Sequence, residues 1–139
     1  MKAGIAWAQW NQRYTKAMKH AALEFLHSKG IKDVAEFDVP GAFELGLAAQ
    51  HLIENEKCDF AVCIGVVIRG ETAHFDYVCK AAQEGCLNVS LKTGRPVGFG
   101  VLTVDTYEQV YERIWGDKGN VGEHAASAAY TMAQRVVKS

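Results

Sequence analysis

The chain has 139 residues, of which 49% are apolar and 22% are charged, and its net charge at neutral pH is −1. This length fits one domain of ordinary size, and the apolar content supports a sizeable core and argues against disorder. The nearly balanced charge argues against a broad nucleic-acid or membrane-surface footprint, although one small anionic ligand needs only a local cluster of donors.

No targeting or membrane segment is expected. The residues after Met1 are too polar for the core of a secretion signal, and no apolar run approaches the roughly 20 residues that span a bilayer. The four cysteines lack a C-x-x-C spacing, so we expect buried free thiols in a cytoplasmic protein rather than a zinc site or a catalytic thiol. These cysteines are Cys58, Cys63, Cys79 and Cys86.

The first part of the chain is typical of two strand–helix pairs. Residues 2–8 are predicted to form a strand, and the helix after it should end at Lys29-Gly30. Residues 34–39 are predicted to form a second strand, which Pro40-Gly41 interrupts before a second helix. The expected buried positions are Tyr14, Met18, Ala21 and Phe25 in the first helix, and Ala42, Leu45, Ala49, Leu52 and Ile53 in the second.

A nearly unbroken apolar run at residues 59–68 predicts the central strand, because a strand buried on both faces shows little polar alternation. The polar turn Arg69-Gly70-Glu71 then leads into a helix from Thr72. The unpaired amides in the first turn of such a helix can bind an anion. The helix should end near Gly94, with an apolar face of Phe75, Val78, Cys79, Ala82, Cys86 and Val89.

The rest of the chain predicts a fourth strand and two more helices. The strand should span residues 96–104, and Asp105 and Glu108 are expected to form a capping box after it. A glycine-rich break at residues 115–122 precedes a last helix from about Glu123. The expected apolar faces are Tyr107, Val110, Tyr111 and Ile114 in the first of these helices, and Ala125, Ala129, Met132 and Val136 in the second.

This strict alternation predicts the α/β class: a flavodoxin-like three-layer α/β/α sandwich with a four-stranded parallel sheet in the order 2-1-3-4, in a single domain over residues 1–139. In such a sheet, ligands bind beyond the carboxyl ends of the strands, where the strand order reverses. The reversal lies between strands one and three, so Trp10-Asn11 and Arg69-Gly70-Glu71 should share one rim.

Several side chains at that rim could carry chemistry, and each also has an ordinary structural explanation. His74 lies at a helix start whose positive end favours a neutral imidazole, which can take and return protons, but it could be only a surface histidine. The turn residues Arg69, Gly70, Glu71 and Thr72 offer a guanidinium, amides and a hydroxyl to a phosphate, or they serve only the turn.

Three further positions carry similar pairs of explanations. Trp10 could stack on a flat heterocycle or cover the edge of the first helix. Phe43 and Glu44 could bind a polyol at a helix start, or Glu44 could interact only with the helix dipole. Arg113 has the properties of a solvated cation at a helix end.

Four motifs make the sequence resemble the lumazine synthases, the family that catalyses the penultimate step of riboflavin biosynthesis. They are VPGAFEL at residues 39–45, IGVVIRGETAHFDYV at 64–78, FGVLTVDTYEQ at 99–109 and GNVGEHAA at 119–126. The resemblance runs from about Ile5 to about Val136 in the family's order. Its most specific part is GETAHF in its strand–turn–helix context.

The resemblance implies a transferase that joins 5-amino-6-(D-ribitylamino)uracil to 3,4-dihydroxy-2-butanone 4-phosphate. The products would be 6,7-dimethyl-8-ribityllumazine, inorganic phosphate and water. It implies no metal or redox cofactor and no nucleic-acid or membrane partner. It also implies a homo-oligomer, a pentamer or a higher assembly, with active sites at the subunit interfaces.

The resemblance further implies roles for individual residues. His74 is the expected proton donor and acceptor, and Phe99 is the expected ring that a neighbouring subunit contributes. The pyrimidine and its ribityl chain are expected at Trp10, Asn11, Gly41, Ala42, Phe43, Glu44, Val66, Val67, Ile68 and Phe99, and the phosphate at Gly70, Glu71, Thr72 and Arg113.

Two positions depart from the family pattern. Val121 replaces the usual lysine of a G-N-K-G segment, which could weaken substrate binding unless Lys118 reaches the site. Arg113 is followed by Ile114-Trp115 rather than by Ala-Gly, and this bulk could reshape the rim of the pocket.

Two other functions stay open on the sequence. One is an archaeal-type riboflavin synthase, which shares the fold and assembly; it needs no phosphate pocket, so the turn at Thr72 and the cation at Arg113 argue against it. The other is a flavin-binding or shell-forming protein without activity. Trp10 and Val121 keep that function open, because a tryptophan on the rim should hold an isoalloxazine ring firmly.

Overall fold

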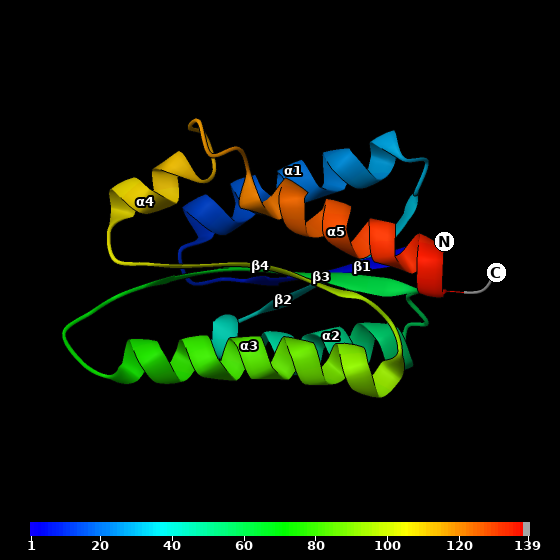
Figure 1. Cartoon of the computed structure of the whole chain (residues 1–139), viewed down its shortest axis with the longest axis horizontal. Coiled ribbons are helices and arrows are strands. Elements are labelled where there is room, and N and C mark those ends of the chain that lie inside the picture. Colours follow the sequence, from blue (N-terminus) through cyan, green and yellow to red (C-terminus); the bar gives the residue numbers. More distant parts are fainter. Residues whose placement is uncertain (138–139) are drawn as a thin grey trace.

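A four-stranded parallel sheet lies between two layers of helices in the computed structural model, which describes residues 1–137 (Figure 1). The strands lie in the order β2-β1-β3-β4, which confirms the predicted α/β class and sheet order. Their bounds are Lys2–Ala8 for β1, Asp33–Val39 for β2, Phe60–Ile68 for β3 and Val97–Val104 for β4. All three pairings between neighbouring strands are parallel.

The helices divide between the two faces of the sheet (Figure 1). One layer contains α1 (Gln12–Ser28), α4 (Tyr107–Glu112) and α5 (Val121–Val136). The other contains the 3-10 helix η1 (Ala42–Glu44), α2 (Leu45–Glu54) and α3 (His74–Thr93). Among residues 1–137, no helix combines the length and the apolar character that crossing a membrane requires.

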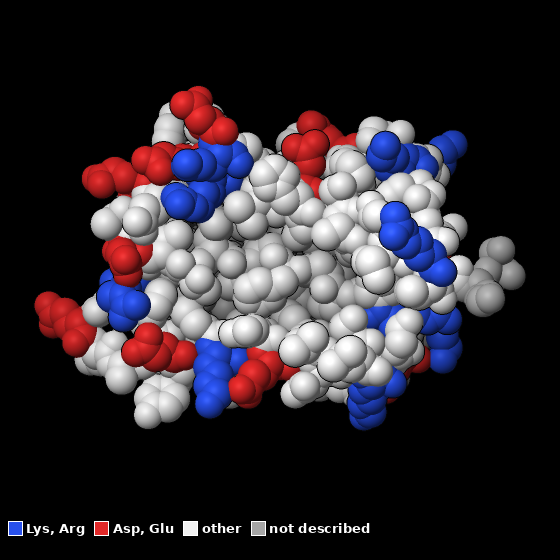
Figure 2. Space-filling view, in the orientation of Figure 1, with Lys and Arg blue, Asp and Glu red and all other residues white. Residues whose placement is uncertain are grey.

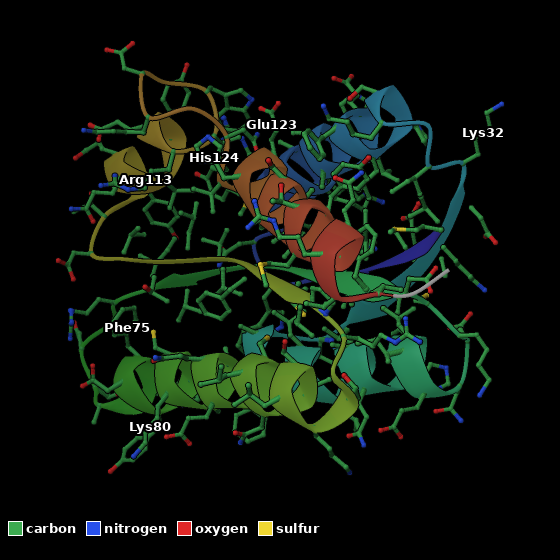
Figure 3. All side chains as sticks on the ribbon, turned by 45° about the vertical axis from the view of Figure 1, so that its right-hand side comes forward. Lys32, Phe75, Lys80, Arg113, Glu123 and His124 are labelled. Atoms are coloured by element: carbon green, nitrogen blue, oxygen red, sulfur yellow. The ribbon has the colours of Figure 1, made fainter. Side chains whose placement is uncertain are left out.

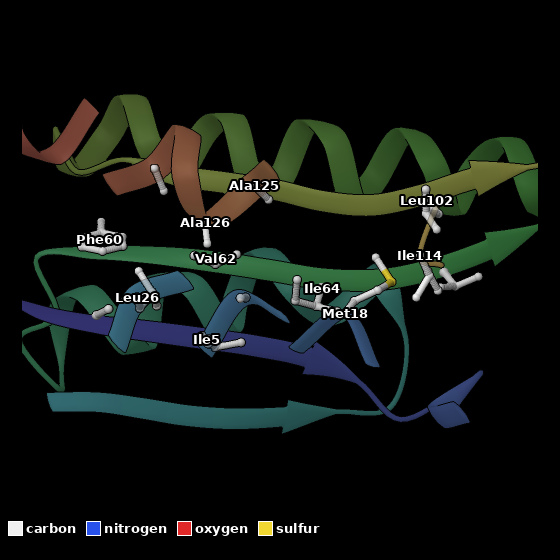
Figure 4. Close-up of a cluster of buried hydrophobic side chains, with 14 of the residues drawn as sticks. Ile5, Met18, Leu26, Phe60, Val62, Ile64, Leu102, Ile114, Ala125 and Ala126 are labelled. Atoms are coloured by element: carbon white, nitrogen blue, oxygen red, sulfur yellow. The ribbon is translucent and has the colours of Figure 1, made fainter. Parts of the chain in front are cut away.

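The central strand β3 is apolar throughout because helices cover both of its faces. Alternate residues of a strand point to opposite faces, so β3 contributes to two separate cores. Phe60, Val62 and Ile64 pack in the core beneath α1 and α5 (Figure 4), whereas Ala61 and Cys63 pack in the core beside α2 and α3. The sequence predicted this double burial from the absence of polar alternation.

The buried face of α1 differs from the predicted one. The buried residues are Thr15, Met18, Ala22 and Leu26, while Tyr14, Ala21 and Phe25 are only partly buried. The reason is Thr15, whose hydroxyl donates a hydrogen bond of 2.8 Å to the carbonyl of Ala8 at the end of β1. This bond satisfies a polar side chain in the core, so the buried face is turned by about one residue from the apolar pattern.

The predicted capping box before α4 is wrong by one residue. Thr106 is the N-cap, and its hydroxyl accepts a hydrogen bond from the amide of Gln109. Asp105 does not cap the helix because its carboxylate accepts a hydrogen bond from Arg69. The helix ends at Glu112. Of its predicted apolar face, Val110 and Ile114 are buried, while Tyr107 and Tyr111 are exposed.

The last helix starts earlier than predicted and buries only part of its predicted face, Ala125 and Ala129. It begins at Val121 rather than near Glu123, because the Asn120 side chain caps it by accepting from the Glu123 amide. Met132 and Val136 of the predicted face are about half exposed. The residues that α5 buries are all small: Gly122, Ala125, Ala126, Ala129 and Ala133.

Small residues let the helices approach one another closely. At the start of α5, a Cβ atom on Gly122 would lie 2.7 Å from the carbonyl carbon of Met18 in α1 and would overlap its oxygen. Between α2 and α3, a Cβ on Gly46 would lie 3.0 Å from the Cα of Gly85. These contacts set how closely the two helices of each pair pack against each other.

The four cysteines are free thiols, as predicted. Cys58, Cys63 and Cys86 are buried, whereas Cys79 is partly exposed. Burial raises the pKa of the Cys58 thiol from 9.0 to about 11, so this group stays protonated at neutral pH.

Candidate functional site

A cavity of about 270 Å³ opens beyond the carboxyl ends of β1 and β3, the two strands between which the strand order reverses. This is the position that the sheet order predicted for a ligand. Many of the predicted site residues form its wall: Trp10, Asn11, Ala42, Val66, Val67, Ile68, Gly70, Thr72 and His74. We call this the first cavity.

A second cavity of about 230 Å³ adjoins the first. The two share Trp10, Ala42, His74 and Val78, so these residues stand between the two spaces. The second cavity adds the start of the η1 segment, and its further lining is Pro40, Gly41, Phe43 and Glu44. The segment predicted for a polyol therefore lies next to the segment predicted for a ring.

The first turn of α3 presents its polar groups to the first cavity. The helix begins at His74, and the amide of His74 donates a hydrogen bond of 3.3 Å to the Thr72 hydroxyl. This hydroxyl keeps its own proton to donate to a ligand. Together with the positive end of a helix of 20 residues, the Thr72 turn is suited to an anion. Glu71, which was also expected here, lines neither cavity.

Arg69 does not supply the cation that the sequence offered to a phosphate at this turn. Its Nε lies 2.7 Å from an oxygen of Asp105, and its Nη1 lies 3.6 Å from an oxygen of Asp76. The hydrogen bond to Asp105 raises the pKa of the guanidinium above its ordinary value. The guanidinium also lies 4.4 Å from the ring centre of Phe75. Arg69 thus joins the carboxyl ends of β3 and β4 rather than facing a ligand.

Trp10 and Asn11 form the wall on the β1 side. The Trp10 side chain is 70% exposed, and its amide donates to the carbonyl of Pro40 at 3.1 Å. Asn11 has a left-handed backbone with φ of 62°, and its side-chain amide donates to the carbonyl of Val66 at 3.1 Å. This bond crosses from the end of β1 to β3. The Asn11 side-chain N–H and the Val66 carbonyl therefore bind each other within the protein.

Glu44 is engaged within its own segment. Its carboxylate accepts a hydrogen bond of 3.1 Å from the amide of Gly41 at the start of η1. A carboxylate has two oxygens with several acceptor positions, so this bond leaves capacity for ligand hydroxyls. The neighbouring Phe43 is exposed and lines the second cavity.

Phe99 and Arg113 lie apart from both cavities. Phe99 is 40% exposed on β4 and lines a different hollow of about 510 Å³ between α3 and α5. Arg113 lies at the end of α4, where its guanidinium donates to the carbonyl of Gln109 at 3.1 Å. Figure 3 shows Arg113 in the α4 layer and Phe75 in the α3 layer, on opposite sides of the sheet. Neither Phe99 nor Arg113 lines the two cavities within one copy of the chain.

The two departures from the family pattern also have defined positions. Val121 is the first residue of α5, packs partly buried against the core, and donates its amide to the carbonyl of Arg113 at 3.0 Å. Lys118 is exposed in the loop before it. Trp115 is partly exposed, and its ring centre lies 5.2 Å from that of Tyr111.

Three residues of the first cavity were not predicted as site residues. Phe75 and Val78 were assigned to the apolar face of α3, and Tyr107 to the inward face of α4. The available signal was position: each lies within the first turns of a helix that follows the carboxyl end of a strand. No group of three or more His, Cys, Asp or Glu side chains within the described residues could hold a metal ion.

Comparison with known proteins gives one consistent family. The family model described as 6,7-dimethyl-8-ribityllumazine synthase matches residues 1–136. The chain is 42% identical over 136 residues to the 6,7-dimethyl-8-ribityllumazine synthase of Cytophaga hutchinsonii, which covers 96% of this chain and 86% of the relative. It is 41% identical to the protein of that name from Bdellovibrio bacteriovorus (95% and 73% covered) and 43% identical to that from Syntrophus aciditrophicus (95% and 87% covered).

Proposed function

Because this chain belongs to the 6,7-dimethyl-8-ribityllumazine synthase family and has lumazine synthase activity in riboflavin biosynthesis, we propose that the two adjoining cavities beside His74 are its active site. The observation that carries the proposal is the first cavity itself, whose wall contains Trp10, Thr72 and His74. These side chains supply a flat aromatic surface, an anion-binding turn and a proton carrier within one small space.

The two substrates divide between the cavities according to their chemistry. The pyrimidine ring of 5-amino-6-(D-ribitylamino)uracil stacks on Trp10, and its ribityl chain extends along Phe43 and Glu44. The phosphate of 3,4-dihydroxy-2-butanone 4-phosphate binds the amides and hydroxyl of the Gly70–Thr72 turn at the start of α3. The ketone is then held beside the amine.

The reaction needs placement of two substrates and movement of protons. The aromatic amine attacks the ketone and expels water to form an imine; phosphate is then eliminated, and ring closure expels a second water. Holding both substrates in one pocket supplies much of the rate. His74 takes and returns the protons that these steps move. The Thr72 turn holds the charge of the departing phosphate.

The experiment combines both substrates with the purified protein and follows the absorbance of the lumazine. The unchanged protein should form product, and His74→Ala should slow turnover about 100-fold or more, as the loss of a general acid–base group does. The native mass of the variant should be unchanged. Equal rates for the two proteins would remove His74 from the mechanism.

We also propose a homo-oligomer, most simply a pentamer, whose active sites lie between subunits. One face of the molecule supports this assembly: where β4 forms the edge of the sheet, the surface between α3 and α5 is hollowed and largely uncharged (Figures 1 and 2). Leu91, Phe99 and Met132 are exposed on it. An exposed apolar face of this kind is typical of a protein–protein interface.

A second copy would complete the site. Covering the β4 face would bring Phe99 of one subunit toward the cavities of the next, and Arg113 would reach the phosphate in the same way. We further propose that the chain is one domain, that its chemistry uses neither a metal nor a redox cofactor, and that it works in the cytoplasm, where its free thiols stay reduced.

A further inference from the structure

Tyr107 lies on the wall of the first cavity, and neither the family resemblance nor its motifs give it a role. It is the first residue of α4 and is 60% exposed, so its phenol is open to a ligand. It reaches the cavity from the β4–α4 joint, whereas Thr72 and His74 reach it from the β3–α3 joint. The cavity wall therefore includes a tyrosine from α4 as well as residues of α3.

Hydrogen bonds hold the segment before α4 beside Arg69 at the end of β3. The amide of Arg69 donates to the carbonyl of Val104 at 2.8 Å, and the Arg69 side chain binds Asp105. The amides of Asp105 and Thr106 both donate to the side-chain oxygen of Gln109, at 2.7 and 3.2 Å. The backbone amide of Gln109 donates a hydrogen bond to the Thr106 hydroxyl. The backbone of Tyr107 is thus part of a fixed helix start, not of a loose loop.

The position of Tyr107 places it away from the ribityl segment and in the cavity that contains the Thr72 turn. Tyr107 lines the first cavity, which also contains Trp10 and Thr72, and it does not line the second cavity, where the ribityl chain is proposed to lie. On the proposed function, which this inference extends, the Thr72 end of the site takes the phosphorylated ketone. We propose that Tyr107 is a specificity-determining residue whose hydroxyl hydrogen-bonds the phosphorylated substrate.

The chemistry of the phenol suits that role. A tyrosine hydroxyl donates one hydrogen bond and keeps its proton at neutral pH, so it can bind a phosphate or a substrate hydroxyl without adding charge. Hydrogen bonds to an ionised acceptor are roughly twice as strong as those between neutral groups. The Thr72 turn and Tyr107 would then hold the phosphorylated substrate from two sides.

Tyr107→Phe tests the inference, because it removes only the hydroxyl. The KM for the phosphorylated substrate should rise about tenfold, the loss expected for one hydrogen bond to a charged group, while the KM for the pyrimidine should stay within about twofold. Tyr111→Phe is the matched control: it lies on the same helix, is exposed, and does not line the cavity. It should leave both KM values unchanged.

Binding of inorganic phosphate, measured by calorimetry, gives a second result that does not depend on turnover. Its Kd should rise in Tyr107→Phe but not in Tyr111→Phe. Unchanged phosphate binding and an unchanged KM in Tyr107→Phe would overturn the inference, as would an equal rise in both KM values. If His74→Ala kept full turnover while Tyr107→Phe weakened phosphate binding, the proposed catalytic site would fail and the Tyr107 contact would stand.

Discussion

Asn11 shows how a single side chain can set the shape of the proposed site. Its left-handed backbone turns the chain sharply at the end of β1, and its amide reaches the carbonyl of Val66. Asparagine is one of the few residues that adopts this conformation readily. The bond fixes the segment that carries Trp10, so we predict that Asn11 positions the aromatic ring.

Asn11→Asp separates the backbone conformation from the hydrogen bond. Aspartate also accepts the left-handed conformation, but it cannot donate to the Val66 carbonyl. The KM for the pyrimidine should rise about tenfold, because a partly buried hydrogen bond is replaced by two facing acceptors. The KM for the phosphorylated substrate should change little. Asn88→Asp, at an exposed position of α3, is the control, and a parallel rise of both KM values in Asn11→Asp would argue against positioning.

Cys58 should make the folded protein less stable at high pH. Its pKa is raised to about 11 by burial, so the unfolded chain loses this proton at lower pH than the folded chain does. The unfolding free energy should therefore fall as pH rises from about 9 to about 11, by about 2 kcal/mol at pH ~10.5. Urea unfolding at pH ~8 and ~10.5 should show this loss in the unchanged protein and a smaller loss in Cys58→Ala. Equal losses would show that other groups cause it.

The locations of single residues were predicted best where a residue lies just after the end of a strand. Trp10, Thr72 and His74 follow directly on strand ends, and the sheet order alone brought them to one rim. Arg69 was left open between a phosphate contact and a turn residue, because the sequence does not show that Asp105 lies beside it. Tyr107 was missed because its helical spacing suggested a core residue.

At the scale of elements, the strands were predicted more accurately than the faces of the helices. The strand β3 is buried on both sides, so its apolar run identifies it directly. The buried face of α1 includes Thr15, whose hydroxyl is satisfied by Ala8. A search for apolar residues at helical spacing does not predict that Thr15 is buried, because the carbonyl that accepts its hydrogen bond belongs to β1. In α5, Ala125 and Ala129 were predicted correctly, but Met132 and Val136 were wrongly counted as buried because apolar character alone does not show which side of a helix faces the sheet.

Gly122→Ala tests how tightly α5 packs on α1. The added methyl group would overlap the main chain of Met18, which cannot move without separating the two helices. The unfolding free energy should drop by about 3 kcal/mol, the upper part of the usual range for overpacking. Gly70→Ala is the control for stability, since nothing lies within 4 Å of the added atom. If both variants unfolded at the same urea concentration, the close approach would be unimportant.

At the scale of the whole molecule, the site of one copy lacks two of its expected members. Phe99 and Arg113 lie away from the cavities that contain Trp10 and His74. The sequence predicted this division only for Phe99, and only through the family resemblance, because no local pattern states which copy supplies a side chain. The uncharged β4 face (Figure 2) is the physical counterpart of that expectation.

Mixing two inactive variants tests whether neighbouring copies share the site. His74→Ala should lose proton transfer, and Arg113→Ala should raise the KM for the phosphorylated substrate far more than that for the pyrimidine. In assemblies formed from equal amounts of both, about a quarter of the interfaces in a head-to-tail ring would combine an intact His74 with a neighbour's intact Arg113. Activity at subsaturating phosphorylated substrate should recover to about that fraction.

The control for this experiment is each variant assembled alone, which should stay inactive under the same conditions. Native mass measurement should confirm that mixed assemblies form. Mixed assemblies without recovered activity would show that His74 and Arg113 act within one copy, and a monomeric mass would exclude a shared site altogether.

The exposed indole of Trp10 has a further consequence for studying this enzyme. Because it forms the wall of the first cavity, a pteridine stacked on it would quench its fluorescence. Trp7, which lies under the Lys19 ammonium at 4.4 Å, and Trp115, on the loop after α4, would contribute a steady background emission. The fluorescence of Trp10 in the unlabelled protein should thus report ligand binding in the first cavity even when no reaction takes place.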